Sequence, residues 1–202
     1  MQVTVDSLLD KLGDESLSSS LAKALRLADR GGNRALAIWC RLELGGYWSS
    51  NSAMTEDVVV PEYRTVPGQH TDIYGRALVV PPDLAFIGET RLRNGIEELE
   101  TLTEGRDEVV MHDPDMCALL REHLEVEVYA FRFSVVHLRG VLAAIRQELA
   151  DKLERSRSTL KASGTRSAES DEEIFEVRPN LWGVGVNLRA LWRRWKGPRQ
   201  EA

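Results

Sequence analysis

Residues 21–48 read LAKALRLADRGGNRALAIWCRLELGGYW, and this stretch sets the type of fold. Apolar side chains recur at helical spacing on both sides of Gly31-Gly32. The glycine pair is a C-cap signal for the first helix, and Asn33 can cap the start of the second. Two helices joined by so short a link predict an antiparallel helical hairpin.

The sequence on either side of this hairpin predicts further short elements. Residues 4–12 place apolar side chains on one face of a helix that Gly13 stops. Residues 47–82 are rich in strand-favouring residues interrupted by Pro-Gly, which predicts an antiparallel sheet of two or three strands with His70 in a solvated loop. A helix is expected to begin at Pro82 and to close at Gly105. Residues 107–112 are expected to form one more short strand.

A long helix is expected from about residue 126 to residue 160. Its apolar positions are spaced 4, 3, 4, 3 and 4 apart: Phe131, Val135, Leu138, Leu142, Ile145 and Leu149. One interpretation is a central core helix. The other is a coiled-coil end over residues 146–160, where Leu149 and Leu153 have no visible partner helix in the chain. The second interpretation predicts self-association as a dimer or higher oligomer.

These elements predict a mainly helical α+β fold, a helical domain with a long C-terminal helix and a small antiparallel sheet, over residues 1–160. Residues 161–173 are polar, Ser-rich and charged, which is typical of a flexible linker. A C-terminal tail with strand and helix patterns is expected at residues 174–202. The two cysteines form no metal-binding motif, and the first 16 residues lack the features of a secretory signal. We therefore expect a cytoplasmic protein with reduced thiols.

The tail is the part of the sequence most typical of an interaction segment. Residues 178–199 carry a charge of +6 without an acidic residue, whereas residues 1–177 hold 20 basic and 31 acidic residues and are −11. Three placements are compatible with this composition: packing on the acidic body, docking on a protein partner, or contact with an anionic membrane or nucleic acid, which is the least favoured. The tail residues expected to make the contact are Trp182, Arg189, Trp192, Arg193, Arg194, Trp195 and Lys196.

A second candidate site is the group formed by His112, Asp113 and Asp115, with Cys117 close by in the sequence. A base, two carboxylates and a thiol could serve a catalytic or metal site. The aspartates also stand where N-caps belong, just before an apolar run, and Pro114 suits a first helical position. We favour caps over chemistry, and we expect no catalytic residue, no metal and no cofactor.

The third candidate is a joint between the second helix of the hairpin and the sheet. Glu43 and Arg64 are expected to form an ion pair there, with Tyr47 and Trp48 covering it. Trp39 is expected to be largely buried, and Tyr63 belongs to the same joint. The residues suit either packing that defines the fold or a binding groove at the seam.

The chain resembles the AbiTii-type domain of bacterial abortive-infection proteins. The resemblance rests on the helix pair with Trp39, on the sequence Glu43-Leu44-x-Gly46-Tyr47 that closes it, and on Pro61-x-Tyr63-Arg64. A proline-led helix and a long final helix with the stretch HLRGVL at residues 137–142 complete it, so that it covers about residues 3–160.

The resemblance implies a role in phage defence and supplies no catalytic residues to transfer. We therefore expect a non-enzymatic recognition or scaffolding module that acts with a defence protein encoded in the same operon. The alternative is a toxin-like effector enzyme, a nuclease or nucleotide hydrolase, that uses the residues around His112.

Overall fold

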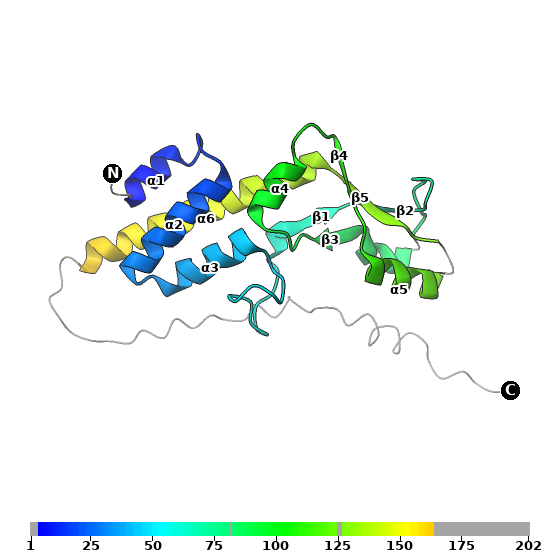
Figure 1. The fold of residues 1–202 in the computed structure, drawn as a ribbon, viewed down its shortest axis with the longest axis horizontal. Helices are drawn as coiled ribbons and strands as arrows, with labels where there is room; N and C mark the ends of the chain where they lie inside the picture. The colour runs from blue at the N-terminus through cyan, green and yellow to red at the C-terminus, as the bar shows by residue number, and fades with distance from the viewer. Residues whose placement is uncertain (1–3, 81, 125–126, 164–202) are drawn as a thin grey trace. The chain divides into compact units, whose positions relative to one another are not determined.

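A computed structural model describes residues 4–80, 82–124 and 127–163 of this chain. The fold over these residues is mainly helical α+β (Figure 1). Its α-helices are α1 (Val5–Lys11), α2 (Leu17–Gly31), α3 (Arg34–Gly45), α4 (Ile96–Leu102), α5 (Pro114–Leu124) and α6 (Val135–Ser163). Its strands are β1 (Thr65–Pro67), β2 (Gln69–Thr71), β3 (Glu89–Arg91), β4 (Glu108–Met111) and β5 (Ala130–Ser134), and its 3-10 helices are η1 (Glu62–Arg64) and η2 (Pro82–Gly88).

The expected helical hairpin is confirmed as α2 and α3. The Ser16 hydroxyl caps α2, and Asn33 Oδ1 accepts a hydrogen bond from the Leu36 amide at 3.1 Å to cap α3. Gly32 ends α2 in the left-handed conformation, with a φ of 72° that side-chain-bearing residues rarely adopt. Local capping and spacing are therefore sufficient to define this hairpin.

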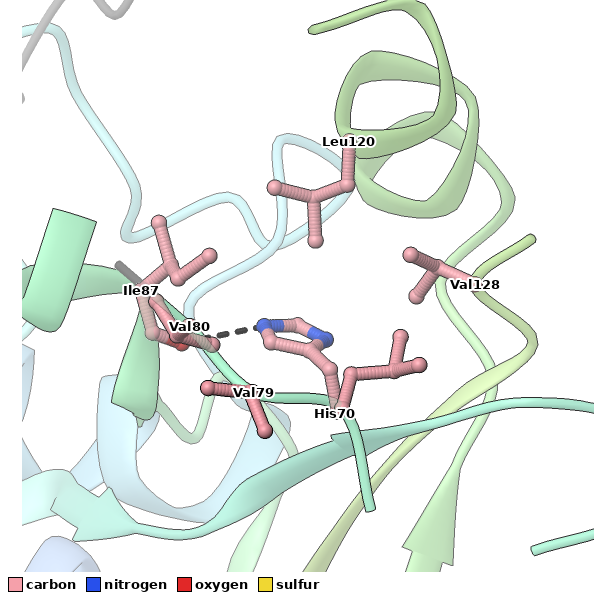
Figure 2. Close-up of a pocket in the computed structure, with 7 residues that line it drawn as sticks. His70, Val79, Val80, Ile87, Leu120 and Val128 are labelled. Carbon is pink, nitrogen blue, oxygen red and sulfur yellow. Dashed lines mark hydrogen bonds between the residues drawn. The ribbon is translucent and has the colours of Figure 1, made fainter. Parts of the chain in front are cut away.

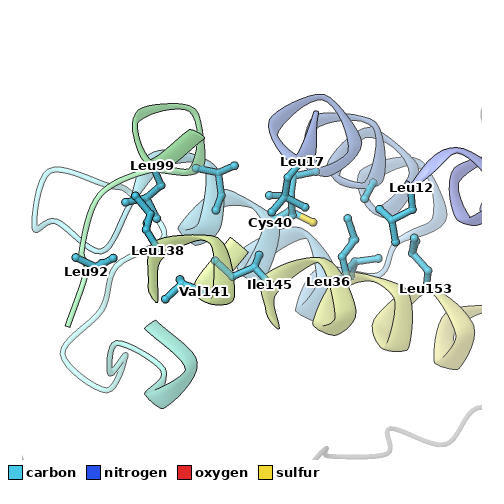
Figure 3. Close-up of a cluster of buried hydrophobic side chains, with 14 of the residues drawn as sticks. Leu12, Leu17, Leu36, Cys40, Leu92, Leu99, Leu138, Val141, Ile145 and Leu153 are labelled. Atoms are coloured by element: carbon cyan, nitrogen blue, oxygen red, sulfur yellow. The ribbon is translucent and has the colours of Figure 1, made fainter. Parts of the chain in front are cut away.

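The long helix α6 forms one wall of the main core. Figure 1 shows it, in yellow, running beside α1 and α2 towards its C-terminal end and beside α4 towards its start. Leu138, Ile145, Leu149 and Leu153 are all fully buried in the cluster that joins these helices (Figure 3). The interpretation of this segment as a central core helix is thus confirmed.

The expectation that Leu149 and Leu153 lack cover within the chain is wrong. Each has 0% of its surface exposed, because α1 and α2 pack against this end of α6. Leu153 shares its cluster with Leu12 and Leu36 (Figure 3). The two leucines therefore offer no surface to a second copy of the chain.

Two small antiparallel sheets accompany the helices. β1 pairs with β3, with Val66 opposite Thr90, and β5 lies between β2 and β4. Only Gly68 separates β1 from β2, so the chain passes from one sheet to the other within a single residue. A Cβ atom on Gly68 would lie 2.4 Å from the Arg132 carbonyl oxygen, which explains the glycine at this crossing.

The segment expected to begin the long helix is partly a strand. Residues 130–134 form β5, and α6 starts only at Val135. Phe131 and Phe133 are buried on one face of this strand. Phe131 lies between His70 of β2 and Met111 of β4, and Phe133 lies opposite Val109 of β4. Pairing with strands on both sides outweighs the helical spacing that Phe131 shares with the residues after it.

Two other expected elements also differ in the structure. Within the described part of residues 47–82 the strands that form are the three-residue β1 and β2, and they belong to different sheets instead of pairing with each other. Ile73 and Val79 instead lie in exposed loops, 62% and 96% exposed. The helix expected from Pro82 is replaced by η2, β3 and, after Gly95, the short α4. The strand expected at residues 107–112 is confirmed as β4.

Candidate functional site

A buried ion pair joins the end of α3 to η1. The Arg64 guanidinium donates to Glu43 Oε2 from Nη2 at 2.6 Å and from Nε at 3.1 Å, and both side chains have 0% exposure. Arg64 Nη1 donates to the carbonyl oxygens of Leu92 and Asn94 at 2.9 and 2.8 Å. Arg64 therefore links three segments that are far apart in the sequence.

Two tyrosines occupy the other oxygen of Glu43. The hydroxyls of Tyr47 and Tyr63 each donate to Glu43 Oε1 at 2.7 Å. Burial, and then the Glu43 carboxylate, raise the pKa of both hydroxyls well above the usual 10, so both stay protonated as donors. The Tyr47 ring also lies 4.8 Å from the Arg64 guanidinium carbon.

The tryptophans of the joint are less buried than expected. Trp39 is partly buried, and its Nε1 donates to the Tyr63 hydroxyl at 3.1 Å. Lys152 Nζ lies 5.1 Å from the centre of the Trp39 ring. Trp48, which was expected to cover the ion pair, is 42% exposed. Tyr47, the other residue expected to cover the ion pair, is only 2% exposed and has its ring against the Arg64 guanidinium.

The five residues Trp39, Glu43, Tyr47, Tyr63 and Arg64 are thus brought together in one hydrogen-bonded group. Both oxygens of Glu43 accept bonds from within the group. A buried charge is tolerated only when it is paired and hydrogen-bonded, as here. We therefore assign this group a role in holding the helices to the sheet.

The residues around His112 are occupied by structural contacts. Asp113 Oδ1 accepts from the Met116 amide at 3.0 Å and caps α5, with Pro114 as the first helical residue. The Tyr129 carbonyl oxygen accepts from His112 Nδ1 at 2.6 Å and from Cys117 Sγ at 3.2 Å. Burial raises the pKa of the Cys117 thiol, which keeps the nucleophilic thiolate scarce.

His70 occupies a different position from the one expected. It was predicted to lie in a solvated loop, but it lies on β2 and is 5% exposed. Its Nε2 is 3.0 Å from the Ile87 carbonyl oxygen, and its Nδ1 is buried without a hydrogen-bond partner (Figure 2). The polar residues on either side of it, Gln69 and Thr71, do not indicate that His70 is buried. The burial of His70 arises from its pairing with Phe131 on β5.

Comparison with known proteins gives the family. The AbiTii family pattern matches residues 4–174, more than four fifths of the chain. The chain belongs to the AbiTii family. No curated protein and no solved structure matches it. The AbiTii assignment points to abortive-infection phage defence, in agreement with the resemblance seen in the sequence.

Several expected features of this AbiTii protein lie outside the described residues. They are the whole tail, including Trp182, Arg189, Trp192, Arg193, Arg194, Trp195 and Lys196, and most of the linker; the side chain of Asp115 is likewise not described. Within the described residues, no three His, Cys, Asp or Glu side chains are grouped so that they could bind a metal ion. No helix of that part of the chain has the length and apolarity needed to cross a membrane.

The role of Asp113 as a cap gives a direct prediction. Asp113→Asn should leave both stability and phage defence unchanged, because asparagine caps a helix about as well as aspartate. Asp113→Ala should lower the free energy of unfolding by about 1 kcal/mol through the lost cap. Chemical denaturation and phage plating measure the two effects. Loss of defence in an Asp113→Asn protein of normal stability would instead indicate chemistry at this carboxylate.

Proposed function

We propose that this AbiTii protein is a non-enzymatic recognition or scaffolding module of an antiphage defence system. The observation that carries the proposal is a turn after β2 that holds large apolar side chains in solvent. Ile73 and Tyr74 are 62% and 76% exposed, and Val79, a few residues on, is 96% exposed. Exposed apolar groups this close together are typical of surfaces that contact another protein.

The turn that carries these side chains is well ordered by hydrogen bonds. Asp72 Oδ1 accepts from the amides of Tyr74 and Arg76, each at 2.9 Å, and Asp72 Oδ2 accepts from Arg76 Nε at 2.7 Å. The chain then returns along β2, where the Leu78 amide donates to the His70 carbonyl oxygen at 2.9 Å. A preorganised surface loses little conformational entropy on binding, which supports a role in recognition.

The charged residues of the described body support the same proposal. Glu43 and Arg64 are enclosed in a satisfied network, and Asp113 caps a helix. These three groups are engaged in contacts that hold the fold. The tail adds tryptophan and arginine, the residues most enriched among binding hot spots. We propose that its partner is a defence protein encoded in the same operon.

Serine substitutions on the turn test the proposal. The pair Ile73→Ser and Tyr74→Ser removes apolar surface already in solvent, so the protein should keep its denaturation midpoint. The number of plaques that phage forms on cells with this variant should rise to the number seen on cells without the protein. The matched control is Val136→Ser, which changes a side chain 67% exposed on α6 and should leave defence intact. Full defence with the turn variant would refute recognition by this surface.

Removal of residues 174–202 tests the contribution of the tail. We expect the remaining body, which holds the complete described core, to keep its helical circular dichroism and a cooperative unfolding transition. Defence should be lost because the Trp- and Arg-rich segment is gone. An unfolded or aggregated product would show that the tail completes the core. A folded product that still protects cells would show that the tail is not required.

A further inference from the structure

A groove on the surface of the helical body lies between the C-terminal end of α3 and the start of α4, two helices that pack against each other (Figure 1). Its volume is about 460 Å³. The lining residues are Leu44, Gly45, Trp48, Gly95, Glu97, Glu98 and Thr101. The groove therefore has an apolar side, from the end of α3 and the tryptophan that follows it, and an acidic side from α4.

Backbone contacts hold the two sides of the groove together. The Tyr47 amide donates to the Arg93 carbonyl oxygen at 2.7 Å. A Cβ atom on Gly95 would lie 2.4 Å from the Leu44 carbonyl oxygen, so only glycine permits this close approach. The Trp48 carbonyl oxygen accepts from the amide of residue 51 at 2.9 Å, which fixes the turn that carries the indole. The groove is thus formed before a partner binds, and this lowers the entropic cost of binding.

The acidic side of the groove has negative charge that the rest of the described chain does not neutralise. Glu97 and Glu98 are both exposed, and no cationic side chain among the described residues forms an ion pair with either. Glu98 Oε1 accepts from Asn94 Nδ2 at 2.7 Å, which leaves Oε2 and the Glu97 carboxylate for a partner. Arg93, close by in the sequence, does not line the groove. The C-terminal end of α3 adds the negative end of a helix dipole, so the groove favours a cation.

Trp48 narrows the choice of cation. It is 42% exposed, and an indole is the aromatic ring that attracts a cation most strongly. A guanidinium group is planar and stacks on such a ring, and its N–H donors match the geometry of carboxylates. An ammonium group is a compact, strongly hydrated charge that does neither as well. A tryptophan beside two carboxylates therefore suits arginine better than lysine.

We propose that this groove binds an arginine side chain in a basic segment of a partner protein. The guanidinium stacks on Trp48 and donates to the two glutamates, and the aliphatic stem contacts Leu44. A free small molecule fits less well, because small-molecule sites enclose most of the ligand, whereas Trp48, Glu97, Glu98 and Thr101 are all exposed. This inference goes beyond the proposed function, which rests on the turn after β2, because binding to the groove is measured on the isolated chain and does not depend on defence.

Three peptides that differ at one position provide the test. They are acetylated and amidated pentapeptides Gly-Ser-X-Ser-Gly, in which X is arginine, lysine or citrulline, the uncharged isostere of arginine. Each is titrated into the ¹⁵N-labelled full chain at neutral pH and low salt, and NMR follows the Trp48 indole N–H and the amides of Glu97 and Thr101. We expect saturable shifts with the arginine peptide in the millimolar range, about threefold weaker binding of the lysine peptide and about tenfold weaker binding of the citrulline peptide. Added salt should weaken the binding of the arginine peptide.

Substitutions on each side of the groove test the two parts of the site. Glu97→Gln combined with Glu98→Gln should keep the fold, since both side chains are exposed, and should weaken binding of the arginine peptide about tenfold. Trp48→Leu should abolish the preference for arginine over lysine, because the ring is gone. The matched control is Glu56→Gln with Asp57→Asn, a consecutive exposed pair outside the groove, which should bind as the wild type does.

Several outcomes would overturn the proposal. Equal binding of the arginine and citrulline peptides to the wild type would show that charge is not recognised. Lysine binding as tight as arginine binding would contradict selection of the guanidinium. An equal loss of binding in the control variant would show that the peptide responds to the net charge of the body and not to the groove.

Discussion

Replacing Arg64 with alanine is expected to lower the free energy of unfolding by about 3–5 kcal/mol. The substitution leaves the Glu43 carboxylate fully buried without its cation, and it removes the donors to the Leu92 and Asn94 carbonyl oxygens. An exposed pair would contribute only about 0–1 kcal/mol, so the burial of this pair sets the size of the effect. Urea denaturation followed by circular dichroism measures it.

A double substitution separates the effect of an unpaired buried charge from the loss of the Arg64 side chain. Glu43→Leu combined with Arg64→Met replaces both charges by apolar groups of similar length. The double variant should be more stable than Arg64→Ala, because no buried charge is left alone. Tyr47 and Tyr63 lose their acceptor in the double variant, which limits the recovery. Equal destabilisation by Arg64→Ala and by the double variant would contradict the role given to the unpaired carboxylate.

Leu149→Asp is expected to unfold the helical body. Truncation of a fully buried leucine alone costs about 2–5 kcal/mol, and a buried, unpaired carboxylate adds several more. The sum approaches the whole stability of a typical domain, about 5–15 kcal/mol. The far-ultraviolet circular dichroism of Leu149→Asp should show loss of helix. Leu149→Ala should lower the free energy of unfolding by about 2–5 kcal/mol, as expected for truncation alone.

Ala143→Asp is the matched control on the same helix. Ala143 is exposed, so its replacement should cost only the difference in helix propensity, about 0.7 kcal/mol or less. Light scattering on both variants also tests the earlier expectation of a dimer. A folded Leu149→Asp protein with a smaller mass than the wild type would show that Leu149 lies between two copies of the chain, against the burial described above.

The elements that the sequence predicted well are those that depend on nearby residues. Ser16, Asn33 and Gly32 define the helical hairpin through caps that involve neighbours within a few positions. The pairing of Glu43 with Arg64 could be expected from their charges. Its complete burial could not, because it depends on carbonyl groups of residues 92 and 94 and on two tyrosines around the carboxylate.

The predictions from the sequence were wrong where helical and strand periodicities overlap, and where a residue's environment depends on strand pairing with distant parts of the chain. Phe131 and Val135 fit the helical spacing of α6, yet Phe131, Phe133 and Val135 also alternate as a strand requires. The strands on each side of β5 decide between these patterns, and they come from residues 69–71 and 108–111. The burial of His70 has the same distant origin. It could not be inferred from its immediate neighbours.

The position of α6 in the core has a consequence for synthesis on the ribosome. Leu17 and Leu21 emerge early, yet Ile145, Leu149 and Leu153 of their cluster are made more than 100 residues later. At a synthesis rate of about 5–20 residues per second, roughly 5–25 s pass between the synthesis of the first helices and that of α6, which covers them. The early segment thus exposes apolar surface throughout this interval, and chaperones that bind nascent chains have that time to act on it.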